Sequence, residues 1–203
     1  MLKTYDFFSS EPIKELDEDN VIAIPTDTVY GLAIKYDSQI AYKKLIAAKG
    51  RDPLKPISVM FASDYDYHRL LITDSKIEKV IKYFLPGALT IVCNARKDAP
   101  YQTHLNTYKI GFRITADIKL DNFLKRLSYP LQVTSANISG NEALVNSDDV
   151  IKTFENKKEV TSIILGKCDS KIATTVVDLS TDKPKLLREG QIPFLKIIEI
   201  YNS

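Results

Sequence analysis

The sequence has few of the residues that build metal sites and disulfides. Its 203 residues include two cysteines, Cys93 and Cys168, and two histidines, His68 and His104. The cysteines lie far apart and outside any CxxC spacing, which argues against a disulfide framework or a zinc site. The histidines form no metal-binding pair. We therefore expect free thiols and no dedicated metal site.

Long apolar runs and a strong charge of one sign are also absent. No apolar run approaches the ~18 residues of a membrane span, and the first six residues lack the apolar core of a signal peptide. The 28 basic and 26 acidic residues leave a net charge of +2, so composition gives no case for a nucleic-acid binder. A local basic face stays possible. These absences predict a soluble, cytoplasmic protein without membrane contact.

The residues that are present are typical of a globular chain, with 44% hydrophobic and 27% charged side chains, which argues against disorder and a coiled coil. Strand and helix patterns alternate irregularly, without repeats or linkers, and predict a single mixed α/β domain over residues 1–203. Predicted helices cover residues 8–18, 38–48, 64–71, 74–84, 118–127 and 147–154. Predicted strands cover residues 21–24, 32–34, 57–61, 88–92, 110–114, 131–133, 162–165, 174–179 and 185–188, followed by an apolar tail, 193–201, that docks on the core.

The stretch over residues 21–32 is the first candidate for a binding site. A β-branched run ends at Pro25, and two hydroxyls, Thr26 and Thr28, then flank the carboxylate of Asp27. Hydroxyls and backbone N–H groups at a strand end lie where open α/β sheets bind ligands. A plain strand followed by a turn is the alternative.

A second candidate lies where the helix over residues 38–48 ends. Lys49 and Arg51 leave the helix on either side of Gly50, and prolines follow at positions 53 and 56. On a continuous helix these two cations would diverge, but on an exit loop they can converge. Alternatively, they are solvated and complement the helix dipole.

Two further strands carry polar groups. In the strand over residues 110–114, Gly111 and Arg113 share one face and leave room for a ligand, unless Arg113 is simply exposed. The strand over residues 131–133 runs into a segment rich in small polar residues, 134–140, which could also be an ordinary Ser/Asn-rich turn. The sequence therefore offers four polar segments that one site could combine.

Together these segments resemble the YrdC family of L-threonylcarbamoyladenylate synthases over nearly the whole chain. The resemblance is carried, in family order and spacing, by residues 25–32 (PTDTVYGL), 49–51 (KGR), 85–90 (LPGALT), 111–113 (GFR), 134–140 (TSANISG), 174–178 (TTVVD) and 187–190 (LREG). The family's KxR…SxN tetrad is intact as Lys49, Arg51, Ser135 and Asn137. The resemblance implies a twisted mixed sheet flanked by helices, with a deep basic concave face.

The resemblance also implies an enzyme. Such proteins form threonylcarbamoyl-AMP and pyrophosphate from L-threonine, bicarbonate or CO₂, and ATP with Mg²⁺. Downstream tRNA-modifying machinery then transfers the threonylcarbamoyl group to the adenosine next to the anticodon. This nucleotidyl transfer needs no side-chain nucleophile, so the protein's work is to position three anionic species and stabilise the developing charge.

Residue roles follow from the resemblance. Lys49 and Arg51 would clamp triphosphate and carboxylate and carry catalysis. Ser135 and Asn137 would contact the nucleotide or its phosphates, and Arg188 would lie on the nucleotide side.

The threonine side would be formed by three other residues. Thr28 and Thr174 would offer hydroxyls, and Arg113 would pair with the threonine carboxylate. Thr26, Asp27 and Tyr30 would only shape the loop.

Several positions depart from the family pattern. Asp52 precedes Pro53 where a proline often follows the KxR arginine, and Lys109 replaces a frequent threonine four residues before Arg113. Ala143 and Leu144 stand where Ser-Pro is common, and Met60 stands where some members have a histidine. These positions concern fine contacts and leave the tetrad intact. We also expect no extra C-terminal domain of the kind that longer relatives carry.

Two other functions remain open at this point. A relative without catalysis could hold double-stranded RNA or a nucleotide in the basic concavity, with salt-dependent affinity. A paralogue could act on another amino acid or acyl acceptor. The polar segment 95–108 is a candidate lid by its length, and the sequence does not give an oligomeric state.

Overall fold

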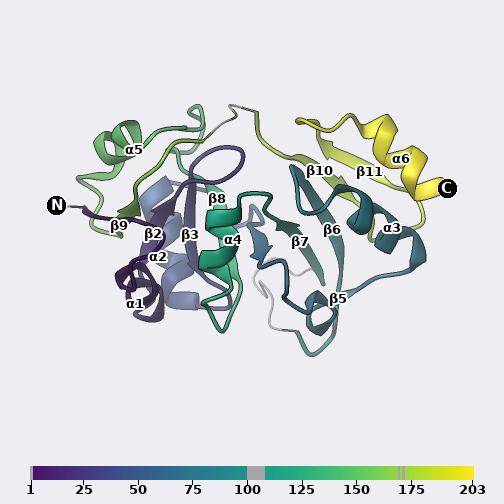
Figure 1. Cartoon of the computed structure of the whole chain (residues 1–203), viewed down its shortest axis with the longest axis horizontal. Coiled ribbons are helices and arrows are strands. Elements are labelled where there is room, and N and C mark those ends of the chain that lie inside the picture. The colour runs from purple at the N-terminus through teal and green to yellow at the C-terminus, as the bar shows by residue number, and fades with distance from the viewer. Residues whose placement is uncertain (1, 100–107, 169, 171) are drawn as a thin grey trace.

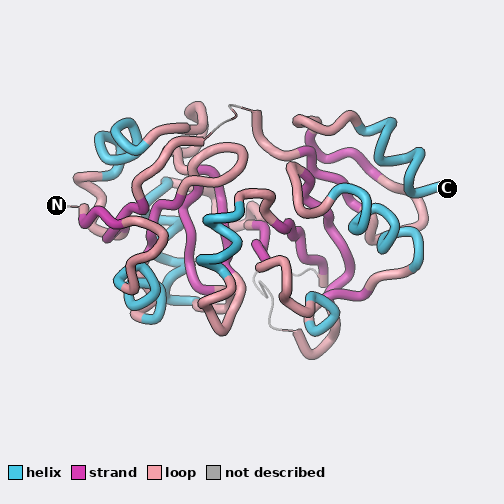
Figure 2. Tube along the Cα trace, viewed as in Figure 1, coloured by secondary structure: helices cyan, strands magenta, loops and turns pink. Residues whose placement is uncertain are grey.

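A computed structural model describes residues 2–99, 108–168, 170 and 172–203 (Figure 1). Within them, a single eleven-stranded sheet is flanked by six α-helices and a short 3₁₀ helix (Figure 2). The strands are β1 (Lys3–Tyr5), β2 (Val21–Ile24), β3 (Gly31–Lys35), β4 (Ser58–Phe61), β5 (Leu71–Ile72), β6 (Leu89–Ala95), β7 (Lys109–Ile114), β8 (Leu131–Ser135), β9 (Val160–Ile164), β10 (Thr175–Asp178) and β11 (Lys185–Arg188). The helices are α1 (Glu11–Asp17), α2 (Gln39–Lys49), η1 (Tyr67–Arg69), α3 (Ser75–Phe84), α4 (Ile118–Leu124), α5 (Ser147–Phe154) and α6 (Phe194–Asn202).

The sheet is mixed and twisted, as predicted. Its strand order is β1-β9-β2-β3-β8-β4-β7-β6-β10-β11, with β5 paired to β6. The pairs β1/β9, β9/β2, β4/β7 and β6/β10 are parallel, and the other pairs are antiparallel. The two chain ends lie at opposite ends of this sheet (Figure 1). The fold class is therefore confirmed, while the single domain over residues 1–203 stays a prediction.

One half of the sheet is covered on both faces. In β2, Val21 and Ala23 pack with residues of α2 and α5, whereas Ile22 and Ile24 pack with residues of α1 and α4. Burial on both faces explains why β2 reads as a continuous apolar run without alternation.

The other half is covered by helices on one face. In β7, Ile110, Phe112 and Ile114 join the core cluster formed with α3 and α6. Gly111 and Arg113 lie on the opposite face and line a cavity, which confirms the predicted alternation of this strand. The face that α3 and α6 leave free is thus the one that carries the candidate site.

Local signals fixed the helix over residues 39–49. The Ser38 hydroxyl accepts a hydrogen bond from the backbone N–H of Ala41 at 3.0 Å, and Gly50 ends the helix with φ = 58°. This left-handed conformation favours glycine, so the chain turns sharply before Arg51. The predicted helix end is confirmed.

Other predictions need correction. A helix over residues 64–71 is wrong: only the short η1 forms, and Leu71 then enters β5, which pairs with β6. β1 was not predicted, because its three residues gain their order from the pairing with β9. The tail docks as expected, as α6, with Ile197 and Tyr201 in the core. Most of the candidate lid, residues 100–107, lies outside the described residues.

The longest of the described helices, α2, has 11 residues. Within the described part of the chain, no helix is long and apolar enough to cross a membrane.

Candidate active site

A cavity of about 420 Å³ lies on the free face of the sheet. Its walls come from β4, β6, β7, β10 and β11, from the end of β8, from the β2–β3 loop, and from the segment between α2 and β4. Six of the eight predicted site residues line it: Thr28, Arg51, Arg113, Ser135, Thr174 and Arg188. The charged side chains in the lining are three arginines, Lys109 and Asp178. The excess of cations suits this cavity to an anionic ligand.

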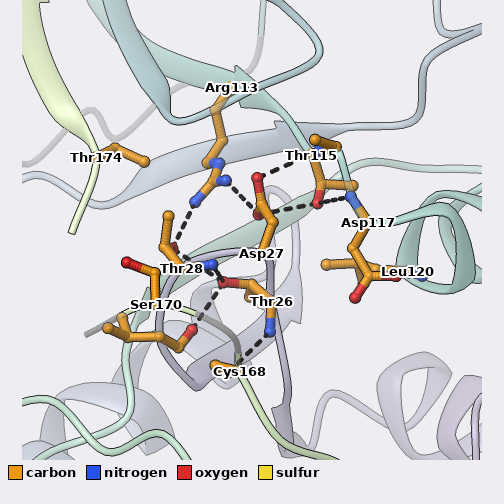
Figure 3. Close-up of polar contacts among 12 residues, drawn as sticks. Thr26, Asp27, Thr28, Arg113, Thr115, Asp117, Leu120, Cys168, Ser170 and Thr174 are labelled. Atoms are coloured by element: carbon orange, nitrogen blue, oxygen red, sulfur yellow. Dashed lines mark hydrogen bonds and ion pairs between the residues drawn. The ribbon is translucent and has the colours of Figure 1, made fainter. Parts of the chain in front are cut away.

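Arg113 lies almost completely buried at the floor of this cavity, with 6% of its surface exposed. One terminal nitrogen, Nη2, is paired with the Asp27 carboxylate, and Nη1 donates to Thr28 Oγ1 at 3.2 Å (Figure 3). Its Nε is buried and has no partner among the described residues. Burial lowers the pKa of Arg113, and the Asp27 charge opposes that shift. The alternative of an exposed strand residue is therefore wrong.

A second arginine sits nearby on the wall. Arg188 donates from Nε and Nη2 to the carbonyl of Thr174, at 3.1 and 2.9 Å, and from Nη2 to the Thr174 hydroxyl at 3.0 Å. Burial lowers the pKa of Arg188, and the charge of Arg113 lowers it further. An anion that binds between two like charges at one cavity relieves the repulsion between them.

Thr90 belongs to the same cluster and was not predicted. Its hydroxyl lies 2.9 Å from the Thr174 hydroxyl, and it lines the cavity. The signal was present in β6, where Leu89, Ile91 and Cys93 face the core and Thr90 must face away.

Arg51 reaches the cavity from the loop after α2. Its Nη2 donates to the carbonyl of Pro56 at 3.1 Å, and its Nε is buried without a partner among the described residues. Burial is the main reason why the pKa of Arg51 is lowered. Arg51 therefore has donor capacity left for a ligand.

Lys49 lies behind the cavity wall and is only 1% exposed. Its ammonium donates to the carbonyl of Ser135, to the carbonyl of Asn137 at 2.8 Å and to Asn137 Oδ1 at 3.0 Å. The Ser135 hydroxyl also donates to Asn137 Oδ1, at 2.6 Å. The alternative of a solvated cap is wrong for this residue, which joins the end of α2 to the loop after β8.

The structure thus places two members of the tetrad in the cavity lining and two outside it. Arg51 and Ser135 line the cavity, whereas Lys49 and Asn137 lie outside its lining. Burial, followed by the charge of Arg51, lowers the pKa of Lys49 to about 8. With all three of its N–H donors engaged, Lys49 acts here by fixing the Ser135 loop and by its charge.

The positions that depart from the family pattern also have defined places. Lys109 lines the cavity and forms an ion pair with Asp178 at 3.0 Å. Met60 lines the cavity as well, and Ala143 is half-buried outside it. In the part of the chain that the structure describes, no three His, Cys, Asp or Glu side chains gather as a metal site.

Comparison with known proteins identifies the family to which this chain belongs. The sequence model of the Sua5/YciO/YrdC family, described as telomere recombination, matches residues 14–190. The chain belongs to the Sua5/YciO/YrdC family. A protein of Methanocaldococcus jannaschii is 32% identical over 186 residues, which cover 91% of this chain and 86% of that protein. The human threonylcarbamoyl-AMP synthase is 28% identical over 190 residues, which cover 88% of this chain and 65% of the human protein.

Solved structures of the Sua5/YciO/YrdC family show the same fold. Pyrococcus abyssi Sua5 in complex with L-threonine matches with a TM-score of 0.89 and 26% identity, covering 98% of this chain and 60% of that one. Escherichia coli YciO matches in fold with a TM-score of 0.81 and 22% identity, covering 94% of this chain and 96% of that one. The chain therefore spans about three fifths of the length of the Sua5 structure.

Proposed function

We propose that this family member is an L-threonylcarbamoyladenylate synthase, a nucleotidyltransferase. The observation that carries the proposal is the meeting of six predicted site residues, from segments far apart in sequence, in one cationic cavity. The human relative named for this activity and the L-threonine bound to a related Sua5 support it. L-threonine, bicarbonate and ATP are the substrates, and pyrophosphate is the second product.

For this reaction the protein must position the substrates and stabilise negative charge. The threonine amine adds to CO₂ to give a carbamate, whose oxygen attacks the α-phosphorus of ATP while pyrophosphate leaves. Arg113, Thr28 and Thr174 hold L-threonine, and Arg51, Ser135 and Arg188 hold the nucleotide. Lys49 and Asn137 support the nucleotide side from outside the cavity lining. Fixed cations that face developing negative charge lower the barrier without a covalent intermediate.

Mg²⁺ enters this proposal with ATP. Asp178 is the carboxylate in the cavity lining, and it already pairs with Lys109. Mg²⁺ is commonly held by one or two carboxylates together with substrate phosphates, so the triphosphate supplies most of its ligands. The bound ion would neutralise phosphate charge.

The direct test is mass spectrometry of the product. Purified protein with L-threonine, bicarbonate, ATP and Mg²⁺ is expected to yield threonylcarbamoyl-AMP, with pyrophosphate release that requires threonine and bicarbonate together. ATP binding without that requirement would overturn the proposal and favour the nucleotide- or RNA-binding alternative. A competition assay between serine and threonine distinguishes the proposed enzyme from a paralogue that acts on another amino acid. A cytoplasmic location and transfer to tRNA by downstream machinery belong to the proposal.

Arg113→Ala is expected to raise the apparent KM for L-threonine by about 100-fold, because the carboxylate loses a charged hydrogen-bond donor. The apparent KM for ATP should stay within about twofold of the unmodified protein's value. Steady-state kinetics with each substrate varied in turn measure both effects. An effect confined to ATP would contradict the assignment of Arg113 to the threonine side.

ATP affinity is expected to fall as pH rises through 8. Lys49, with its pKa lowered to about 8, is charged below that pH and neutral above it. Phosphates bind better to the charged form, and bound ATP therefore holds the proton to a somewhat higher pH. Calorimetric titration at pH 7.5 and 9.5 measures the change, and Lys49→Met should abolish it. An equal fall in that variant would assign the effect to another group.

A further inference from the structure

The carboxylate of Asp27 is a charged group that the proposed function does not yet use. It lies outside the cavity lining, beside the guanidinium of Arg113 (Figure 3). Besides pairing with Arg113 Nη2, it accepts hydrogen bonds from Thr115 Oγ1 at 3.0 Å and from the backbone N–H of Ala116 at 3.2 Å. The Asp27 side chain is 14% exposed and that of Arg113 is 7% exposed. The pair is therefore shielded from water, unlike an ordinary surface ion pair.

We propose that Asp27 is a positioning residue for amino-acid recognition. It holds the guanidinium of Arg113 in the orientation in which Arg113 meets the carboxylate of L-threonine. The inference rests on the proposed function and adds a residue to its threonine side.

The geometry of the guanidinium supports this role. Two of its nitrogens are fixed, Nη2 by Asp27 and Nη1 by Thr28, and these two contacts define the plane of the group. Nε remains buried and unpartnered among the described residues, on a side chain that lines the cavity. An arginine held in this way presents donors to an incoming carboxylate without losing further side-chain freedom.

Asp27 is itself held between two rigid segments. Thr115 and Ala116 form the turn between β7 and α4, where the Thr115 hydroxyl also accepts from the backbone N–H of Asp117 at 3.1 Å. On the other side, Thr26 Oγ1 donates to the Val29 carbonyl at 2.7 Å and closes the β2–β3 loop. The carboxylate therefore has a fixed place from which to orient Arg113.

A purely electrostatic role would act in the opposite direction. If Asp27 only offset the positive charge of Arg113, its neutralisation would leave the cavity more cationic, and L-threonine and ATP would both bind more tightly. If Asp27 orients Arg113, neutralisation would weaken binding of L-threonine and leave that of ATP nearly unchanged. The sign of the change in threonine affinity separates the two roles.

The test is calorimetric titration of L-threonine and of ATP into Asp27→Asn. Whichever way the new amide turns, its NH₂ group faces a donor that Asp27 now accepts from. We expect threonine affinity to fall about tenfold, the usual effect of losing a hydrogen bond to a charged group, with ATP affinity within about twofold. Rotation of the Arg113 guanidinium is the expected cause.

Asp121→Asn is the matched control. Asp121 also accepts from a backbone N–H and a hydroxyl, both of Ser63, at 2.7 and 2.8 Å, and pairs with Lys125 at 2.7 Å. It does not line the cavity, so threonine affinity should be unchanged in this variant.

A second variant keeps the test decisive if Asp27→Asn does not fold. Thr115→Val keeps the charge of Asp27 and removes one of the groups that donate to it. We expect threonine affinity to fall threefold or more, which corresponds to about half of the free energy of one hydrogen bond to a charged group. Thr115→Ser should restore binding. Equal or tighter threonine binding by Asp27→Asn, or by Thr115→Val in its place, would overturn the positioning role. Failure of the unmodified protein to bind L-threonine would instead overturn the proposed function.

Discussion

Lys49→Met is expected to reduce kcat about 100-fold or more, although Lys49 is not exposed in the cavity. The ammonium holds the carbonyls of Ser135 and Asn137 and the Asn137 amide oxygen together. Methionine fills a similar volume but donates nothing, so the loop that carries Ser135 is released. Steady-state pyrophosphate release measures the loss.

The cost to stability in Lys49→Met should be much smaller than the cost to turnover. The Ser135 carbonyl still accepts from the Asn137 N–H, and Asn137 Oδ1 still accepts from the Ser135 hydroxyl. Among the described residues, only the Asn137 carbonyl then loses its donor. We expect the free energy of unfolding to fall by about 1–2 kcal/mol, because relief from burying a charge offsets part of the loss. Lys44→Met, in the same helix and bonded to Asn20 at 2.8 Å, is the control. Near-normal turnover by Lys49→Met would refute this role.

Arg51→Ala is expected to lose turnover to a similar extent, about 100- to 1,000-fold, without a comparable loss of stability. The Arg51 side chain donates to the Pro56 carbonyl and leaves a buried Nε without a partner among the described residues. Its removal takes a cation from the nucleotide side and disturbs little else. Product formation with saturating threonine and ATP, together with urea unfolding, measures both quantities.

Arg126→Ala provides the matched control for Arg51→Ala. Arg126 also donates to backbone carbonyls, those of Phe7 and Ser9, at 2.7 and 2.8 Å, but lies outside the cavity lining. Its removal should leave kcat unchanged. If Arg51→Ala turned over normally while folded, the assignment of Arg51 to catalysis would be wrong.

The two cationic residues of the KxR motif, Lys49 and Arg51, thus have different physical roles, which their spacing in the sequence did not reveal. Gly50, with φ = 58°, turns the chain between them. Lys49 consequently points into the protein and Arg51 toward the cavity. The exit loop was predicted correctly from the glycine, but the burial of Lys49 depends on its contact with Ser135 of β8, 86 positions further along the chain. No local pattern encodes that contact.

Local patterns did determine much of this protein. The alternation of β7 placed Arg113 opposite the core, and the cap at Ser38 and the glycine after Lys49 set the bounds of α2. These features depend on side-chain periodicity and on backbone preferences that act within a few residues. The motifs that carry the family resemblance are likewise short and contiguous.

Tertiary structure alone decided how those pieces cooperate. Asp27 became a partner of Arg113 because the folded sheet brings the β2–β3 loop against β7, joining residues 86 positions apart. Thr90 met Thr174 where the parallel strands β6 and β10 begin. Short strands such as β1 and β5 likewise exist because a distant strand accepts their hydrogen bonds. The sequence determined which polar groups leave the core, since periodicity is local. Only the folded sheet decided which of them meet, since pairing between distant strands is a property of the whole chain.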